Sequence, residues 1–268
     1  MEILNMKIAI LITGHVRNFL KTYPSFSENL FYLREENDVD VIIDTWQVSD
    51  SRYTVANKYF PSKESEVDID TINKLYNPIH LNVEDFEQIK DKFQAEKFFP
   101  DHILKHLYLE NEKREKDPTG GRILFKDGYF LFAPQFYKFK QANEKRKEIE
   151  KQKNIKYDLI IRTRFDIRFC QKFTAPTDVS TLYFSLKYND FFVCGDDDNM
   201  NIFCNVFDHL YRISSTHLTH PFPWHSDFHM YSAEYFQEWN LLDNGITLDK
   251  RQYPVNGPWL CEIERMYN

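Results

Sequence analysis

Several features that mark common protein classes are scarce or missing in this sequence. It has seven glycines and no Gly-x-Gly-x-x-Gly motif, which argues against a dinucleotide-binding oxidoreductase. Its four cysteines form no Cys-x-x-Cys pair and have no histidines at zinc-finger spacing, so we expect free thiols in a reducing compartment. No run of about 18 apolar residues occurs, and the formal charge of −7 lacks a basic excess. These absences predict a cytoplasmic protein with neither a membrane span nor a nucleic-acid partner.

The length and composition are those of one folded domain. A chain of 268 residues can bury a single sizeable core, and 42% hydrophobic with 28% charged residues is ordinary for a globular protein. Aromatic residues are abundant, with 24 Phe and 16 Tyr. This excess has two interpretations, a drift in composition or aromatic faces that stack on sugar rings or a nucleobase. We expect one domain spanning residues 1–268.

Apolar runs and amphipathic segments alternate along the chain. Apolar runs predict strands at 7–13, 38–44, 78–83, 157–168, 181–184 and 191–193. Apolar spacing predicts helices at 19–33, in one or two pieces between 84 and 115, and at 133–153, 200–214 and 228–239. Segment 113–121, with its proline and glycine pair, is predicted to be a loop. This order predicts an α/β fold with a mostly parallel, Rossmann-like sheet flanked by helices.

Polar residues follow the first two predicted strands. Ligands of open parallel sheets bind beyond the C-terminal strand ends. There Gly14 would let a phosphate approach the backbone, and Arg17, two residues after His15, can pair with a phosphate through two hydrogen bonds. Asp44 and Trp46 end the second strand at the same edge, and Trp46 can stack on a base or a sugar. The structural alternatives are an ordinary turn with a surface arginine and a core tryptophan with a polar cap.

Alternating charges follow the buried run 159–161. Arg162, Arg164, Asp166 and Arg168 would point to one side for as long as the strand continues. Buried charges are costly unless they are paired or bound, so the arginines could neutralise a diphosphate leaving group. Asp166 could instead hold a divalent cation that bridges the two phosphates. The structural alternative is an Arg–Asp network at the sheet edge.

Two later segments offer further candidates. The acidic run 196–199 is typical of a helix N-cap, with acceptor or metal binding as the functional alternative. Asp227 and, second, His225 lie at a predicted helix start and are candidates for the base that removes the acceptor proton in inverting transfer. For Asp227 the alternative is again an N-cap. The nearby histidines do not form His-Glu-x-x-His, which argues against a zinc hydrolase.

Four segments resemble, in order, a known group of enzymes. They are KIAILITGHVRNF, IIDTW, PQFYKFKQANEKRKE and YDLIIRTRFDIRF. They are similar to GT-A-fold glycosyltransferases of bacterial and viral surface-polysaccharide clusters, which carry I-x-G-x-x-R, a strand ending in TW and a late YDLVIRxRxD. The resemblance covers residue 6 to about residue 170. It implies a nucleotide-sugar donor at the Gly14–Arg17 turn and Asp166 in the place of the metal-binding motif, with Mn²⁺ or Mg²⁺ as its cation. Arg164 replaces the first Asp of the usual Asp-x-Asp, so arginine neutralisation of the diphosphate is the alternative.

The sequence therefore predicts a nucleotide-sugar-dependent glycosyltransferase of polysaccharide or glycoconjugate synthesis. Its donor part would cover about 1–170 and its acceptor part about 171–268. The predicted donor-binding residues are Gly14, His15, Arg17, Asp44, Trp46, Arg162, Arg164 and Asp166. The acceptor would be a glycan or a lipid-linked glycan, with at most a peripheral membrane contact through the lysine-rich segment 138–153. The alternatives are a non-catalytic nucleotide- or glycan-binding protein and another Rossmann-like transferase, such as a methyltransferase.

Overall fold

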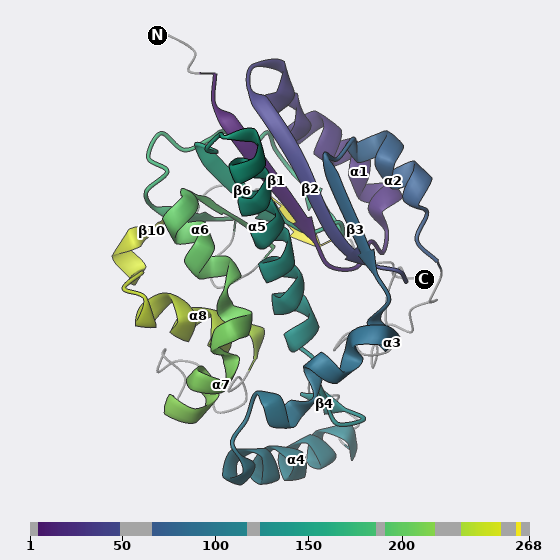
Figure 1. Cartoon of the computed structure of the whole chain (residues 1–268), viewed down its shortest axis with the longest axis vertical. Helices are drawn as coiled ribbons and strands as arrows, with labels where there is room; N and C mark the ends of the chain where they lie inside the picture. The colour runs from purple at the N-terminus through teal and green to yellow at the C-terminus, as the bar shows by residue number, and fades with distance from the viewer. Residues whose placement is uncertain are drawn as a thin grey trace.

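A mostly parallel sheet forms the centre of the protein (Figure 1). The computed structural model describes residues 5–48, 66–116, 124–185, 191–217, 232–252 and 261–263. Within them the central sheet has seven strands in the order β10-β8-β9-β6-β1-β2-β3. The bounds are β1 Lys7–Thr13, β2 Asp38–Trp46, β3 His80–Glu84, β6 Leu159–Thr163, β8 Leu182–Phe184, β9 Phe192–Gly195 and β10 Arg251–Gln252. Strands β6, β1, β2 and β3 are parallel, so their carboxyl ends meet at one edge.

Helices cover both faces of this sheet (Figure 1). Helices α1 and α2 contribute to the apolar core on one face, and α5, α6, α7 and α8 to the core on the other. The bounds are α1 Phe19–Asn29, α2 Ile69–Tyr76, α3 Phe86–Ile89, α4 Asp101–Lys116, α5 Ala133–Lys153, α6 Asp197–Cys204, α7 Val206–Thr216 and α8 Ala233–Asp243. Short 3₁₀ helices are η1 Phe31–Glu35, η3 Lys90–Phe93, η4 Ala95–Lys97 and η6 Leu248–Lys250. Small strands outside the central sheet are β4 Phe125–Lys126, β5 Tyr129–Phe130, β7 Ile167–Phe169 and β11 Cys261–Ile263.

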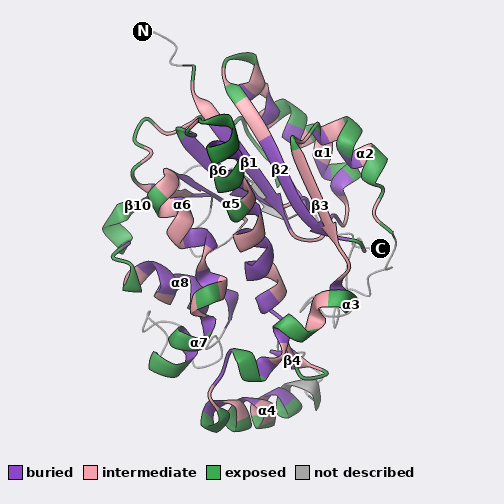
Figure 2. Ribbon diagram, in the orientation of Figure 1, coloured by how far each residue is buried: buried purple, intermediate pink, exposed green. Residues whose placement is uncertain are grey.

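The two apolar layers follow from the alternation of side chains in the central strands. In β1 the isoleucines at alternate positions pack in the core beneath α1 and α2, whereas Ala9 and Leu11 pack in the core beneath α5. Both faces of β1 and β2 are therefore buried, as the continuous apolar runs predict. Figure 2 shows these strands as buried and places exposed residues on the outer turns of α2 and α4.

The segment between β3 and α5 lies beyond the carboxyl edge of the sheet. It contains α3, η3, η4, α4 and the β4–β5 hairpin, which Figure 1 places below the strand ends. Phe99 and Phe130 pack edge to face at 5.0 Å between ring centroids, and Phe236 of α8 packs 5.4 Å from Phe130. Asn111 of α4 accepts hydrogen bonds from the backbone of the hairpin at Leu124 and Phe125. This aromatic packing joins the segment to the same core as α5 and α8.

The predicted α/β class and the mostly parallel sheet flanked by helices are confirmed. Strand 7–13 and helix 133–153 have the predicted bounds, because local apolar patterning and caps determine both ends. In α5 a proline occupies the first turn, and Asn154 ends the helix in a left-handed conformation with φ +51°. Within the described residues, no helix is both long and apolar enough to cross a bilayer.

Several predicted boundaries are wrong. The helix predicted at 19–33 ends at Asn29 and is followed by η1. Strand 157–168 ends at Thr163, because β7 leaves the central sheet and pairs with β11. The four charged residues of that segment therefore do not share one face. Helix α4 continues through Lys116 into the predicted loop 113–121, whose remaining residues lie outside the described ones. Helix 200–214 is two helices separated at Asn205, and α8 begins at Ala233, with residues 228–231 outside the described part.

Candidate functional site

The carboxyl edge between β1 and β6 is the switch point of the sheet. The connection from β1 to β2 runs through α1 on one face, whereas β6 is reached through α5 on the opposite face (Figure 1). The crossover direction therefore reverses between these two neighbouring strands. In open α/β sheets this reversal leaves a crevice where ligands bind. Two of the predicted donor segments, the turn after β1 and the turn after β6, meet at this edge.

The turn after β1 is attached to the end of β2. Gly14 has φ +97°, a conformation that favours glycine, and its N–H donates to the Asp44 carbonyl oxygen at 3.2 Å. Thr45 Oγ1 donates to the Gly14 carbonyl oxygen at 2.7 Å. His15 Nδ1 lies 3.2 Å from the Val48 carbonyl oxygen. The N–H and the carbonyl oxygen of Gly14 are thus both hydrogen-bonded to β2. These bonds fix the turn that contains Arg17.

Arg17 and Arg164 meet on the carboxylate of Asp166. Arg17 Nη1 pairs with Asp166 Oδ2, which also accepts from Arg164 Nη2 at 2.7 Å, and Arg164 Nε donates to Asp166 Oδ1 at 2.8 Å. The Asp166 side chain is 1% exposed, whereas those of Arg17 and Arg164 are 21% and 16% exposed. The carboxylate is enclosed and the two guanidinium groups reach the surface.

Electrostatics at Asp166 strongly favour its ionised form. Burial raises the pKa of Asp166, but the charges and hydrogen bonds of Arg164 and Arg17 outweigh burial and hold that pKa well below its usual range. Asp166 therefore carries a full negative charge at neutral pH. Three arginines, Arg17, Arg162 and Arg164, thus lie with this carboxylate at one edge of the sheet. Guanidinium groups pair well with phosphate oxygens.

Arg162 lies on the α5 side of the same edge. Its side chain is almost fully buried, and its Nε donates to Thr13 Oγ1 at 3.0 Å. The guanidinium carbon lies 3.6 Å from the centroid of the Phe139 ring, a cation–π arrangement. Arg168, by contrast, is exposed on β7. The structure thus brings three of the four charged residues of this segment to the switch point, Arg162 beneath it and Arg164 and Asp166 in the turn.

Asp44 belongs to a buried charge network at the ends of β2 and β3. Lys138 Nζ of α5 lies 2.5 Å from Asp44 Oδ1 and 2.6 Å from Glu84 Oε2. Asn82 Nδ2 donates to Asp44 Oδ2 at 3.1 Å, and Tyr137 OH donates to Glu84 Oε1 at 3.2 Å. Burial raises the pKa of Asp44 to about 6, although the charge and hydrogen bond of Lys138 oppose this shift.

Trp46 lies inside an aromatic cluster. It is 1% exposed, and its ring packs edge to face with Phe86 at 5.6 Å and with Phe93 at 6.1 Å between centroids. The Lys138 ammonium lies 4.0 Å from the centroid of the Trp46 ring, and His15 lies at 6.2 Å. This packing is what the structural alternative predicts, in which Trp46 is a core residue at the end of β2. Stacking of Trp46 on a base or a sugar stays a prediction.

The other sequence candidates have different placements. Asp196 caps α6 by accepting from the Asn199 backbone N–H at 2.9 Å, so the N-cap interpretation is confirmed. Asp227 and His225, the candidate bases, lie outside the described residues. The lysine-rich segment is a surface only in part, because the side chains of Lys138 and Arg146 are fully buried. Ion pairs hold these two cations inside the protein, and a peripheral membrane contact through the rest of the segment stays a prediction.

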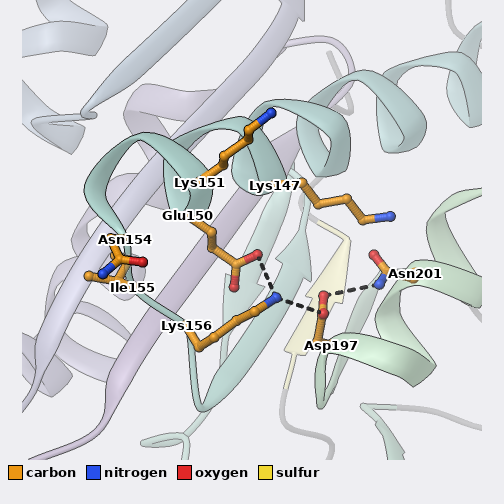
Figure 3. A pocket seen from close by; sticks show the side chains of 8 residues that line it. All are labelled: Lys147, Glu150, Lys151, Asn154, Ile155, Lys156, Asp197 and Asn201. Carbon is orange, nitrogen blue, oxygen red and sulfur yellow. Dashed lines mark hydrogen bonds and ion pairs between the residues drawn. The ribbon is translucent and has the colours of Figure 1, made fainter.

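A separate hollow of about 620 Å³ lies at the far end of α5, beside the start of α6 (Figure 3). It is lined by Lys147, Glu150, Lys151, Asn154, Ile155, Lys156, Asp197 and Asn201. Lys156 Nζ lies 3.6 Å from Glu150 and 3.3 Å from Asp197, and the buried Arg146 pairs with the same two acids. The acids in this hollow thus link α5 to α6, which gives them a structural role.

Four residues at the edge are not singled out by the sequence analysis. They are Thr13, Asn82, Glu84 and Lys138. The strand-end rule could have found Glu84, which follows predicted strand 78–83 directly. Helical spacing could have found Lys138, which lies four residues before the inward-facing Ala142. Both signals are weak alone, because a charged residue at either place is usually solvated.

The described residues do not fit a divalent-cation site at Asp166. Both of its oxygens accept hydrogen bonds from arginines, so neither is left to a cation without breaking an ion pair. In the part of the chain that the structure describes, no group of three or more His, Cys, Asp or Glu residues could hold a metal ion. The reaction proposed below therefore does not use Mn²⁺ or Mg²⁺. A metal at Asp166 stays a prediction from the resemblance.

The raised pKa of Asp44 predicts an unusual pH dependence of stability. Between about pH 4 and pH 6 the native state keeps a proton on Asp44 that the unfolded chain has released, so stability falls as pH rises through this window. The fall is roughly 1.4 kcal/mol for each pH unit. The variant D44N cannot ionise and should lack this component. We expect the unfolding free energy of D44N, relative to the natural protein, to increase from pH 4 to pH 7 in urea titrations. A constant difference would contradict the raised pKa.

Comparisons with known proteins do not assign this chain to a family. No protein-family model matches the sequence, and no curated protein matches it. The proposed function therefore rests on the arrangement of residues at the switch point.

Proposed function

We propose that this protein is a glycosyltransferase that moves a sugar from a nucleotide-sugar donor to a glycan or a lipid-linked glycan. One observation carries the proposal. Arg17 and Arg164 converge on the buried Asp166 at the switch point, and Arg162 lies on the α5 side of the same edge. The place is where open α/β sheets bind ligands, and guanidinium groups pair well with the oxygens of a diphosphate. A GT-A-like fold is the finer form of this proposal, supported by the sequence resemblance.

The arginines would stabilise the leaving group. When the bond between the sugar carbon and the phosphate oxygen breaks, both bonding electrons go to that oxygen and negative charge builds on the diphosphate. Positively charged donors fixed in place before the reaction stabilise such charge most effectively. Asp166 holds Arg17 and Arg164 together against their mutual repulsion, and Thr13 orients Arg162. In this proposal Asp166 positions the arginines and does not contact the donor.

Acceptor activation is assigned to the C-terminal part of the chain. In inverting transfer a base takes the proton of the acceptor hydroxyl while its oxygen attacks the sugar carbon from the far side. Asp227 remains the first candidate and His225 the second, on sequence grounds. The donor part would comprise about 1–170 and the acceptor part about 171–268. The buried Cys194 and Cys204 are free thiols, which supports a reducing, cytoplasmic setting.

The deciding experiment is a thermal-shift screen against UDP, GDP, CDP, TDP and their sugars. A ligand that binds only the native state raises the melting temperature with concentration. We expect one nucleotide family to give a shift, and its sugar to be transferred or slowly hydrolysed. Binding without turnover, unaffected by D227N, would favour a non-catalytic binding protein. Absence of a shift with every nucleotide would overturn the donor site.

Nucleotide binding is expected to survive removal of divalent cations. Arginines already supply the positive charge, and both Asp166 oxygens are occupied by ion pairs. The dissociation constant of the best nucleoside diphosphate should change by less than about threefold in EDTA, since a contribution below about 0.7 kcal/mol is expected from the cation. Calorimetry with and without EDTA checks this. A loss of binding in EDTA that Mn²⁺ restores would assign the metal role predicted by the resemblance.

A further inference from the structure

A lysine of α5 is completely enclosed between two carboxylates. The Lys138 side chain has no exposed surface, and its Nζ contacts Asp44 at 2.5 Å and Glu84 at 2.6 Å. Removing an ammonium from water is costly, and a buried ion pair is often no more stabilising than apolar side chains of similar volume. The enclosed charges are therefore better explained by the geometry that they impose than by a gain in stability.

That geometry joins two strand ends to one helix. Asp44 lies near the end of β2 and Glu84 ends β3, so the single ammonium of Lys138 ties both ends to α5. The ammonium also lies 4.0 Å from the centroid of the Trp46 ring, on β2. The contacts with Asp44 and Trp46 thus fix the position of the β2 end relative to α5, and the contact with Glu84 holds the end of β3. A shift of β2 along its own axis would break the two contacts to β2.

The end of β2 in turn holds the turn that carries Arg17. The Asp44 carbonyl oxygen accepts from the Gly14 N–H, and the Thr45 hydroxyl donates to the Gly14 carbonyl oxygen. Three residues later Arg17, with φ +40°, pairs with Asp166. The path from Lys138 to the arginine cluster therefore consists of described contacts between neighbouring groups. These contacts run through the Asp44 side chain and then through the two hydrogen bonds of Gly14.

We propose that Lys138 is a positioning residue for the donor diphosphate, acting through the ion pair with Asp44 and the turn from Gly14 to Arg17. The inference rests on the proposed function, because it requires a diphosphate at the arginine cluster. Lys138 is enclosed and does not touch the ligand. Asp44 likewise acts through its carboxylate on Lys138 and through its backbone on Gly14.

A double-mutant cycle tests this path. The probe is whichever of UDP, GDP, CDP and TDP gives the largest thermal shift, titrated by calorimetry in EDTA. We expect K138M to weaken binding about tenfold and R17A to weaken it at least as much. In the R17A background, K138M should cause no further loss, because two residues that act through one contact are not additive. The control K145M removes the exposed pair of Lys145 with Glu148 on the same helix and should leave affinity unchanged.

Two further variants separate positioning from folding. If K138M does not fold, K138M/D44N removes the ammonium together with its closest carboxylate and should fold with the same loss of affinity. D44N alone removes the ion pair but keeps an amide oxygen that can accept from Lys138, so it should weaken binding less than K138M does. Full affinity in the lysine variants, or an equal further loss in the R17A background, would overturn the inference while R17A still weakens binding. Failure of R17A to weaken binding would instead overturn the donor site itself.

Discussion

Replacing Arg164 by alanine is expected to weaken the binding of a nucleoside diphosphate by about tenfold to 100-fold. A hydrogen bond to a charged group contributes roughly 1.5–3 kcal/mol, and each 1.4 kcal/mol is a factor of ten in affinity. Arg164 is partly exposed at the switch point and is fixed there by two hydrogen bonds to Asp166, so its charge is already in place when the ligand arrives. Calorimetric titration at constant ionic strength measures the effect.

Arg212 offers a matched control for this variant. It too pairs with an aspartate, Asp243, but it lies on α7 with about half of its side chain exposed. R212A removes the same charge from the protein and should leave affinity within about twofold, since exposed ion pairs contribute little. Equal losses in R164A and R212A would mean that overall charge, rather than the switch point, governs binding. Unchanged affinity in R164A would remove Arg164 from the proposed donor site.

Local patterning was sufficient to predict most of the central sheet. The strands β1 and β2 each contain an uninterrupted apolar run, at 8–12 and 41–43, and these local runs were enough to place both strands. The end of β6 was different. Whether the chain continues straight after Thr163 depends on β7 pairing with β11 and on Ser25 of α1, whose hydroxyl accepts from the Phe169 N–H at 3.0 Å. These partners lie far away in the sequence, and no local pattern encodes them.

The candidate site, like the sheet, was predicted from the sequence only in part. The rule that ligands bind beyond parallel strand ends pointed to Arg17, Arg164 and Asp166, which the structure does bring together. It did not show that Asp44 is enclosed, since enclosure depends on Lys138 entering from a helix that follows much later. A lysine within a helix usually extends into solvent, so sequence alone favoured a surface role. The tertiary contact reverses that expectation.

The two aspartates of this edge differ in what surrounds them, and their energetics differ accordingly. Asp166 has two arginines and is exposed by only 1%, so its charge is more than balanced. Asp44 shares one ammonium with Glu84, so burial dominates and its pKa rises to about 6. Among the described side chains, the arginines therefore gather beside β6, whereas Asp44 and Glu84 lie at the ends of β2 and β3. An anionic ligand would be attracted to the β6 side, where the proposed diphosphate site lies.

The variant D166N is expected to lower the free energy of unfolding by about 3–5 kcal/mol at pH 7. Removing one partner of a buried ion pair leaves the remaining charges uncompensated, and here Arg17 and Arg164 would face each other without the carboxylate between them. The exposed pair of Lys140 with Asp208 provides the control, and D208N should lose less than about 1 kcal/mol. Urea unfolding of both variants gives the comparison. Equal losses would contradict a special role for the buried carboxylate.

The pH dependence of that loss follows from the direction of the pKa shift. Because the native pKa of Asp166 lies below its unfolded value, its contribution is complete above about pH 4 and is lost as the pH falls toward the native pKa. The stability difference between the natural protein and D166N should therefore be constant from pH 5 to pH 8 and shrink in more acidic solution. The corresponding difference for D44N changes between pH 4 and pH 6 instead, since the pKa of Asp44 is raised. The stability differences of D166N and D44N would thus depend on pH in different ways. A general acid destabilisation of the fold would instead give both variants the same pH dependence.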